Sequence, residues 1–237
     1  MSSPEITILT PTIGSNSLFK LIDSLDNNQS VPFVHILLWD DKRVDKFLYP
    51  NPETLTVLSP DSLNSSSPNL RYSIVIPGSF IQGQAYGSAL RSIGLLAAQT
   101  PFVTFLDDDC WIEPNHLSNL LKTVENHEWA YCRRKIFKNV GNSVQYLGVD
   151  NFESVGDALS KKVPYEMVDN NCMIFSRRFG SSGAVIYREV TSYSDDRQFY
   201  AFLKKHAGQP GKSELATINQ VCPKRLEEMF EKCCAKE

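Results

Sequence analysis

A run of apolar residues that ends abruptly in three aspartates constrains the fold of this chain more than any other stretch. Phe102–Leu106 is rich in aromatic and β-branched side chains, which is typical of a strand buried on both faces of a sheet. Asp107, Asp108 and Asp109 follow directly, and three adjacent like charges repel one another. A hard divalent cation relieves such repulsion, because Mg²⁺ and Mn²⁺ prefer oxygen ligands. A solvated acidic turn would explain the same three residues, so the flanking sequence must decide.

Strand-like and helix-like segments alternate along the first half of the chain. Strands are predicted over residues 5–10, 34–39, 71–76 and 102–106, and amphipathic helices over residues 18–25, 85–99 and from Pro114 onward. This alternation predicts an α/β fold with a mostly parallel, Rossmann-like sheet flanked by helices. Ligands of such sheets bind beyond the carboxyl ends of the strands. The residues expected on that rim are Thr10, Pro11, Thr12, Asp40, Asp41 and Asp107–Asp109.

The second half of the chain has a more mixed character. Residues 129–137 and 143–149 are predicted to form a hairpin, and the short apolar stretches 173–178 and 184–190 to close against the sheet. Helices are predicted from Asp195 to about His206, with Ser194 as N-cap, and from Pro223 onward. Residues 50–70 are expected to form a long surface connection. We therefore predict one domain in two halves, residues 1–125 with the parallel sheet and residues 126–237 with the smaller mixed part.

Composition excludes several classes of protein. The net charge of −3, with no Lys/Arg run longer than two residues, argues against nucleic acid as the main partner. No signal peptide, myristoylation site or run of 18 apolar residues is apparent, so the expectation is a cytoplasmic protein without a membrane span, free or at a membrane surface. The six cysteines show no zinc-type spacing and are expected to be reduced thiols.

Four stretches of the first half share a likeness to one known family: Ile6–Thr12, Leu37–Asp41, Ala89–Ala98 and Phe105–Pro114. Through them, residues 5–125 resemble the nucleotide-sugar-binding half of glycosyltransferase family 2, on the GT-A fold. In order, the stretches are similar to the opening strand, the apolar run before two aspartates, the helix written ARNxGLxxA and the FLDDDxxxxP signature. Two departures stand out: Ser92 replaces a usual Asn, and Lys42-Arg43 replaces a usual Gly-Ser after the two aspartates.

The resemblance implies a metal-dependent, inverting enzyme that moves a sugar from a nucleoside diphosphate sugar to the hydroxyl of a saccharide or another acceptor. Asp40 or Asp41 would accept hydrogen bonds from the base or ribose, with Thr10, Pro11 and Thr12 around them. Asp109 is the expected ligand of Mn²⁺ or Mg²⁺. Asp107 would meet the ion or the ribose, and Asp108 the nucleotide or the sugar. Arg91 is expected to be a structural or phosphate-side contact.

A catalytic base is implied by a second, shorter likeness. Ser194–Tyr200 resembles the acidic pair of the family before an aromatic-bearing helix, where the second acid is the base. That position is Asp196, with Asp195 as the second candidate; the alternative is that both residues merely cap the helix. His206 is a weaker candidate for the metal site. The polar run Asp169–Cys172 is a candidate border of the acceptor site, on polarity alone.

Two other functions stay open at this point. The chain could bind a sugar nucleotide or a protein partner without turnover. It could also be a sugar nucleotidyltransferase, although Thr12–Asn16 lacks the Gly-rich loop with Lys or Arg that such enzymes place after the first strand. Donor sugar, acceptor and oligomeric state are not indicated by the sequence.

Overall fold

The computed structural model describes residues 3–40, 69–76, 87–141, 143–150, 168–189, 195–222 and 227. Several predicted features lie outside these residues: Asp41, most of the 50–70 connection, the capping Ser194 and all but one residue of the helix predicted from Pro223.

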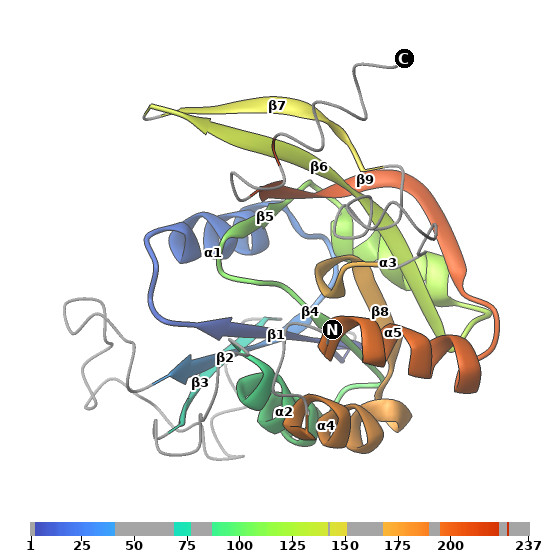
Figure 1. Cartoon of the computed structure of the whole chain (residues 1–237). Helices are drawn as coiled ribbons and strands as arrows, with labels where there is room; N and C mark the ends of the chain where they lie inside the picture. Colours follow the sequence, from blue (N-terminus) through green and yellow to red (C-terminus); the bar gives the residue numbers. More distant parts are fainter. Residues whose placement is uncertain are drawn as a thin grey trace.

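The first half forms the parallel sheet that the alternation predicts. The strands are β1 (Ile6–Thr12), β2 (Phe33–Asp40), β3 (Leu70–Ile76) and β4 (Phe102–Phe105), with β1 paired in parallel to both β2 and β4, and β2 to β3. Helix α1 (Ser17–Asn28) follows β1, and α2 (Ser88–Ala97) precedes β4. The carboxyl ends of β1 and β2 therefore meet at one edge of the sheet, where their arrowheads lie in Figure 1.

From Cys110 onward, the chain continues the same sheet with mixed pairing. The strands of this part are β5 (Cys110–Ile112), β6 (Trp129–Val140), β7 (Ser143–Val149), β8 (Met173–Ser176) and β9 (Gly211–Val221), and its helices are α3 (His116–Val124), α4 (Gly180–Glu189) and α5 (Asp195–His206). The strand order is β3-β2-β1-β4-β8-β6-β9-β5, and β7 pairs with β6. The predicted hairpin is confirmed, with β6 extending to Val140 beyond the expected end at Phe137.

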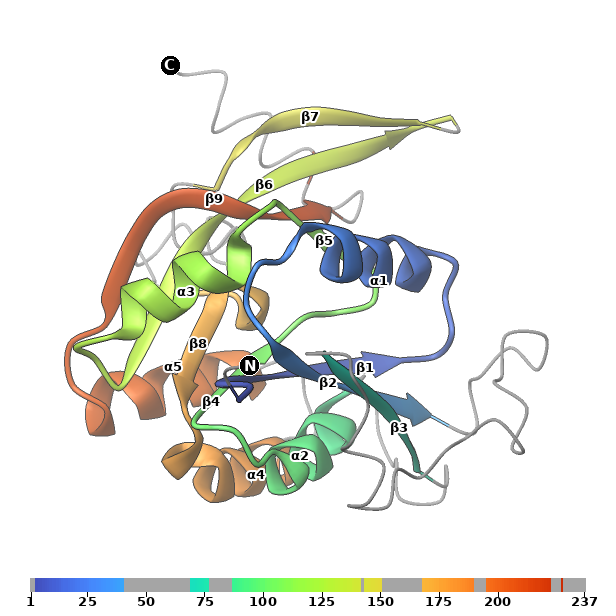
Figure 2. The same cartoon turned by 180° about the vertical axis from the view of Figure 1, so that it is seen from behind.

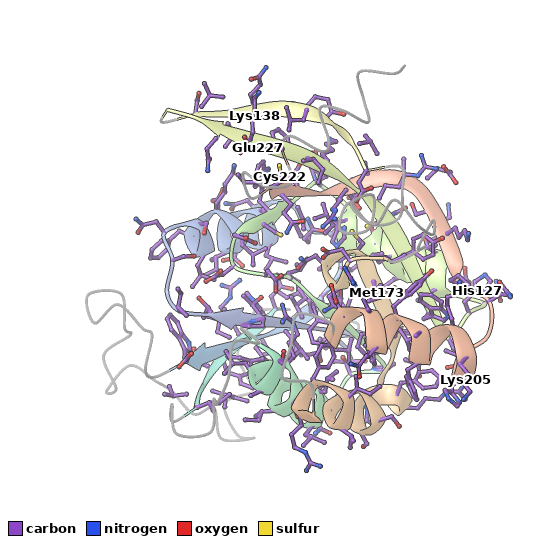
Figure 3. The ribbon with its side chains drawn as sticks, viewed as in Figure 1. His127, Lys138, Met173, Lys205, Cys222 and Glu227 are labelled. Carbon is purple, nitrogen blue, oxygen red and sulfur yellow. The ribbon has the colours of Figure 1, made fainter. Side chains whose placement is uncertain are left out.

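Helices cover both sides of the curled sheet. Helices α2 and α4 lie together beneath β1 and β2, and the hydroxyl of Ser92 donates to the carbonyl of Ala184 at 2.8 Å between them. On the opposite side, α1 packs against β5, and α3 packs against β6 and β9, as seen from behind in Figure 2. The core fills the space between these layers. Met173 of β8 points into it, whereas His127 and Lys205 lie at the periphery (Figure 3).

Three elements differ from the sequence-based prediction: α4, β9 and the short strand β5, which the sequence does not predict. The sequence predicts a short apolar segment against the sheet at 184–190, but residues 180–189 form helix α4. Gly183 lets α4 pack closely against Phe199 of α5, because a Cβ at position 183 would lie 2.8 Å from Cε2 of Phe199. The 11-residue strand β9 is not predicted by the sequence, since its exposed and buried positions do not alternate regularly. No helix in the described part of the chain is long and apolar enough to cross a bilayer.

Candidate functional site

An open cleft of about 730 Å³ lies at the carboxyl ends of β1, β2 and β4. Its volume is in the range of small-ligand and cofactor sites. Residues from three strand ends and from α2 meet there, as the position of polar residues after the strands predicts. The lining consists of Pro11, Thr12, Ile13, Asp40, Gly87, Leu90, Arg91, Asp107, Asp108 and Asp109.

The start of α2 brings a guanidinium group to the carboxylates. Gly87 precedes the helix with a φ of 83°, a conformation that side-chain-bearing residues rarely adopt. A Cβ at this position would lie 3.0 Å from Nη1 of Arg91 and 3.3 Å from Cβ of Pro11. The bare glycine therefore allows Arg91 to lie close to the end of β1. Arg91 itself is 8% exposed and forms an ion pair with Asp107.

Asp107 is held from two sides. One carboxylate oxygen accepts from Arg91, and the other accepts from Nδ2 of Asn171 at 3.1 Å. The backbone N–H of Asp107 donates to Oδ1 of the same Asn171 at 2.6 Å. Both carboxylate oxygens are thus engaged by the protein, which makes Asp107 a weaker candidate for direct metal ligation than Asp109.

Asp108 and Asp109 both line the cleft, but their contacts differ. Thr12 donates its hydroxyl to Oδ2 of Asp108 at 2.6 Å and accepts from the backbone N–H of Gly14. Asp109 is exposed on one side, and its Oδ1 accepts a long contact of 3.5 Å from Sγ of Cys110. Desolvation of the carboxyl, followed by the charges of Asp107 and Asp108, raises the pKa of Asp109 to about 7. This carboxyl is therefore the one that a cation would relieve most.

A buried ion triad lies behind the carboxylates. Arg134 of β6 donates to Asp150 at 3.0 Å and to Asp169 at 2.5 Å. Burial opposes the charge of Arg134, but Asp169 and Asp150 outweigh burial and raise its pKa. Likewise, burial works against the Asp169 carboxylate, but Arg134 outweighs it and lowers the pKa of Asp169. Asp169 in turn accepts from the backbone and side chain of Asn171, which joins the triad to Asp107.

Thr10, predicted to border the nucleotide, is fully buried and is not part of the cleft lining. Its hydroxyl lies 3.0 Å from Nε2 of His35, and Nδ1 of His35 accepts from Nε of Arg71 at 2.9 Å. Because Nδ1 is an acceptor, the ring hydrogen is on Nε2 and points to Thr10. Burial, followed by the charge of Arg71, holds the pKa of His35 well below its usual range.

The neutral state of His35 predicts a pH dependence of stability. The unfolded chain takes up a proton near pH ~6.5, whereas the folded chain does not, so the free energy of unfolding should fall as the pH drops below that value. Urea denaturation of the wild type and of His35→Gln at pH 7.5 and 5.5 measures this. The stability difference between the two proteins should shrink by about 1 kcal/mol at the lower pH. An equal difference at both pH values would show that His35 takes up its proton in the folded protein as well.

Asp195 and Asp196 lie at the start of α5, and Asp196 is not part of the cleft lining. The backbone N–H of Arg197 donates to Oδ1 of Asp196 at 2.7 Å. One turn later, Phe199 is fully buried and its ring centroid lies 5.4 Å from that of Tyr187 and 6.4 Å from that of Phe105. His206 ends the same helix, away from the cleft lining, with its ring 4.8 Å from that of Phe202.

The polar run Asp169–Cys172 does not form an open border. It is a short 3₁₀ turn whose residues Asn170, Asn171 and Cys172 are buried behind the carboxylates. Sequence analysis missed the role of Asn171, because its contact with Asp107 joins residues 64 positions apart. The available signal was two consecutive asparagines directly before a buried strand, where an amide without a partner would be costly.

Comparison with known proteins identifies the fold. The model of the family "Glycosyl transferase family 2" matches residues 80–189, which include two of the four stretches that carry the resemblance. No curated protein sequence matches the chain. The crystal structure of S. aureus TarS residues 1–349 is similar, with a TM-score of 0.60 at 15% identity over 98% of this chain and 65% of TarS 1–349. TarS 1–349 in complex with UDP-GlcNAc gives a TM-score of 0.59 at 16% identity, over 93% of this chain and 59% of that one.

The chain thus spans less than two thirds of the TarS chains that it resembles. Identities of 15–16% establish the fold, and the family match adds the residues of α2, of β4 and of the aspartates that follow β4. Together these findings show that the chain has the GT-A fold and that residues 80–189 resemble glycosyltransferase family 2.

Proposed function

We propose that this protein is a glycosyltransferase that moves a sugar from a nucleoside diphosphate sugar to the hydroxyl of a saccharide or another acceptor. One observation carries the proposal: buried Asp40 at the end of β2 and the three aspartates that follow β4 line the same cleft, although they lie far apart in the sequence. That cleft lies where α/β sheets bind ligands.

Different residues of the cleft lining suit different parts of a donor. Asp40 is 4% exposed, and a carboxylate there can accept from the N–H groups of a base or the hydroxyls of a ribose. Arg91 and the Asp107–Asp109 row would face the diphosphate, with a cation between them and its charge. The structures of TarS with UDP and with UDP-GlcNAc support a nucleoside diphosphate sugar as the donor class.

A divalent cation fits the donor set of the cleft. In the described ranges, no three His, Cys, Asp or Glu side chains are grouped to hold an ion by themselves. Mg²⁺ and Mn²⁺ commonly use one or two carboxylates, with waters and substrate phosphates completing the shell. Asp109 would hold the ion, and Asp107 would orient the site from its contacts with Arg91 and Asn171. When bound, the cation would stabilise the negative charge that develops on the departing diphosphate.

Asp196 is the proposed general base. It precedes the buried Phe199 by three residues, so both side chains lie on the same face of α5, toward β4. Asp196 would remove the proton from the acceptor hydroxyl as that oxygen attacks the anomeric carbon opposite the leaving group, which inverts the configuration. Exclusion of water on acceptor binding would raise the proton affinity of the carboxylate.

A screen of nucleoside diphosphate sugars for release of the diphosphate tests the activity, and the anomeric configuration of the product tests inversion. Asp196→Asn should lower kcat by about 10²- to 10⁴-fold while UDP still binds. Asp23→Asn, which removes an exposed carboxylate on α1, is the charge-matched control and should leave kcat unchanged. Full activity of Asp196→Asn would reject the base and leave the capping role. If no donor in the screen releases diphosphate, the protein is better explained as a binding protein without turnover.

A further inference from the structure

Asn171 contacts Asp107, the first residue of the Asp107–Asp109 row, although the two residues are 64 positions apart in the sequence. It belongs to the buried 3₁₀ turn before β8 and is 1% exposed. Its Oδ1 accepts the backbone N–H of Asp107 at 2.6 Å, and its Nδ2 donates to Oδ2 of Asp107 at 3.1 Å. The same Nδ2 donates to Oδ1 of Asp169 at 2.8 Å. One amide therefore fixes both the backbone and the side chain of the first aspartate.

The orientation of Asn171 is itself determined. An asparagine amide can be turned over, which would exchange its donor and acceptor ends. Here Asp169 needs a donor, because it is a carboxylate paired with Arg134, and the N–H of Asp107 needs an acceptor. In a flipped amide, the oxygen would face the carboxylate of Asp169, and the NH₂ group would face the backbone N–H of Asp107. Both hydrogen bonds would be lost. The Arg134 triad therefore holds Asn171 in the orientation that serves Asp107.

The aspartate row depends on that position. The carbonyl of Asp107 accepts from the N–H of Cys110 at 3.1 Å, which closes a tight turn around Asp108 and Asp109. Arg91 holds the other carboxylate oxygen of Asp107 from α2. Loss of the Asn171 contact would leave Arg91 alone to orient Asp107, and the start of the turn would lose its anchor to β8.

We propose that Asn171 is a positioning residue for sugar transfer, which fixes Asp107 and the turn that presents Asp109 to the donor. This inference rests on the proposed function. Residues that orient metal or substrate ligands contribute about 10- to 100-fold to activity or affinity. Both the oxygen and the NH₂ group of the Asn171 side chain are used. An aspartate at this position has the same shape and keeps the acceptor, but it loses the donor. It also adds a negative charge beside the three aspartates.

Asn170 provides a matched control in the same turn. It is 5% exposed, and its Oδ1 accepts from the hydroxyl of Tyr187 at 2.9 Å, on the side of α4 rather than of the aspartate row. Asn170→Ala and Asn171→Ala should both lower the melting temperature, since each removes a buried hydrogen-bonding amide. A purely structural role for Asn171 predicts that the two variants also share the same kcat.

The test compares kcat with the donor found in the screen, UDP affinity by calorimetry, and the exchange of the Asp107 amide by NMR. Asn171→Ala should lower kcat by about 10- to 100-fold relative to Asn170→Ala, and its Asp107 amide should exchange about tenfold faster. Asn171→Asp should keep the amide protected and still lose activity. Equal kcat for the two alanine variants, with wild-type exchange at Asp107, would overturn the inference. If the wild type itself releases no diphosphate, the proposed function fails instead, and the exchange result still decides the contact.

Discussion

Replacing Asp109 by asparagine should lower kcat for sugar transfer by about 10²- to 10³-fold, the usual effect of removing one group that stabilises transition-state charge. The same variant should unfold at the same temperature as the wild type or at a higher one. Asp109 is exposed on one side, and its charge is repelled by Asp107 and Asp108, so its loss relieves repulsion in the folded protein. Steady-state kinetics and thermal denaturation measure the two effects separately.

Glu125→Gln is the matched control for this prediction. Glu125 is an exposed carboxylate that follows α3, outside the cleft lining. It should change neither kcat nor the melting temperature, because isolated surface charges contribute little. Activity of Asp109→Asn at the level of Glu125→Gln would contradict the assignment of Asp109 as the cation ligand.

The largest loss of stability is expected from Arg134→Ala. Arg134 neutralises Asp150, whose side chain is 3% exposed, and Asp169, whose side chain is 22% exposed. Removing one partner of a buried ion pair leaves uncompensated charge, which costs about 3–5 kcal/mol. We expect a decrease of this size in the free energy of unfolding, measured by urea denaturation, and a loss of UDP binding through the displaced Asn171.

The neighbouring arginine is the control. Arg133 pairs with Glu214 at 2.5 Å, but the two side chains are 39% and 77% exposed. Solvent screens such a pair, and Arg133→Ala should change the free energy of unfolding by less than about 1 kcal/mol. Equal effects of the two substitutions would mean that the triad behind the cleft is not the stabilising element inferred from its burial.

The parallel half of the fold could be predicted because each of its elements has a local signal. β1, β2 and β4 end at Thr12, Asp40 and Phe105, and each end follows a mostly apolar run of the kind that burial on both faces requires. The rule that ligands bind at carboxyl strand ends is enough to bring Pro11, Thr12, Asp40 and the three aspartates around one cleft. Arg91 joins them from helix α2.

The same local reasoning includes Thr10 in the site, but Thr10 is fully buried and is not part of the cleft lining. Alternate side chains of a strand point to the same face, so Thr10 and Thr12 cannot be told apart by the face that they share. The structure separates them by depth. Thr12 reaches Asp108 at the end of β1, whereas Thr10 lies one pleat deeper, beside His35.

Elements that depend on distant contacts could not be predicted. Strand β9 pairs in parallel with β6 through two register shifts. The sequence of neither strand contains a local signal for this pairing. Helix α4 contains two serines and a glycine at 181–183, which are weak helix formers, and forms because it packs against α2. Asn171 belongs to the same group, because its partner Asp107 is 64 residues away.

Calorimetric titration of UDP into the protein, with Mn²⁺ and after chelation of all metal, tests the central claim most directly. The claim is that the aspartates that follow β4 hold a cation which binds the diphosphate of the donor. We expect UDP to bind about tenfold or more tightly with Mn²⁺, because without the cation the diphosphate meets three carboxylates. Asp109→Asn should abolish that gain. Equal affinity with and without the metal, or no binding of UDP, GDP or dTDP in either case, would contradict the account.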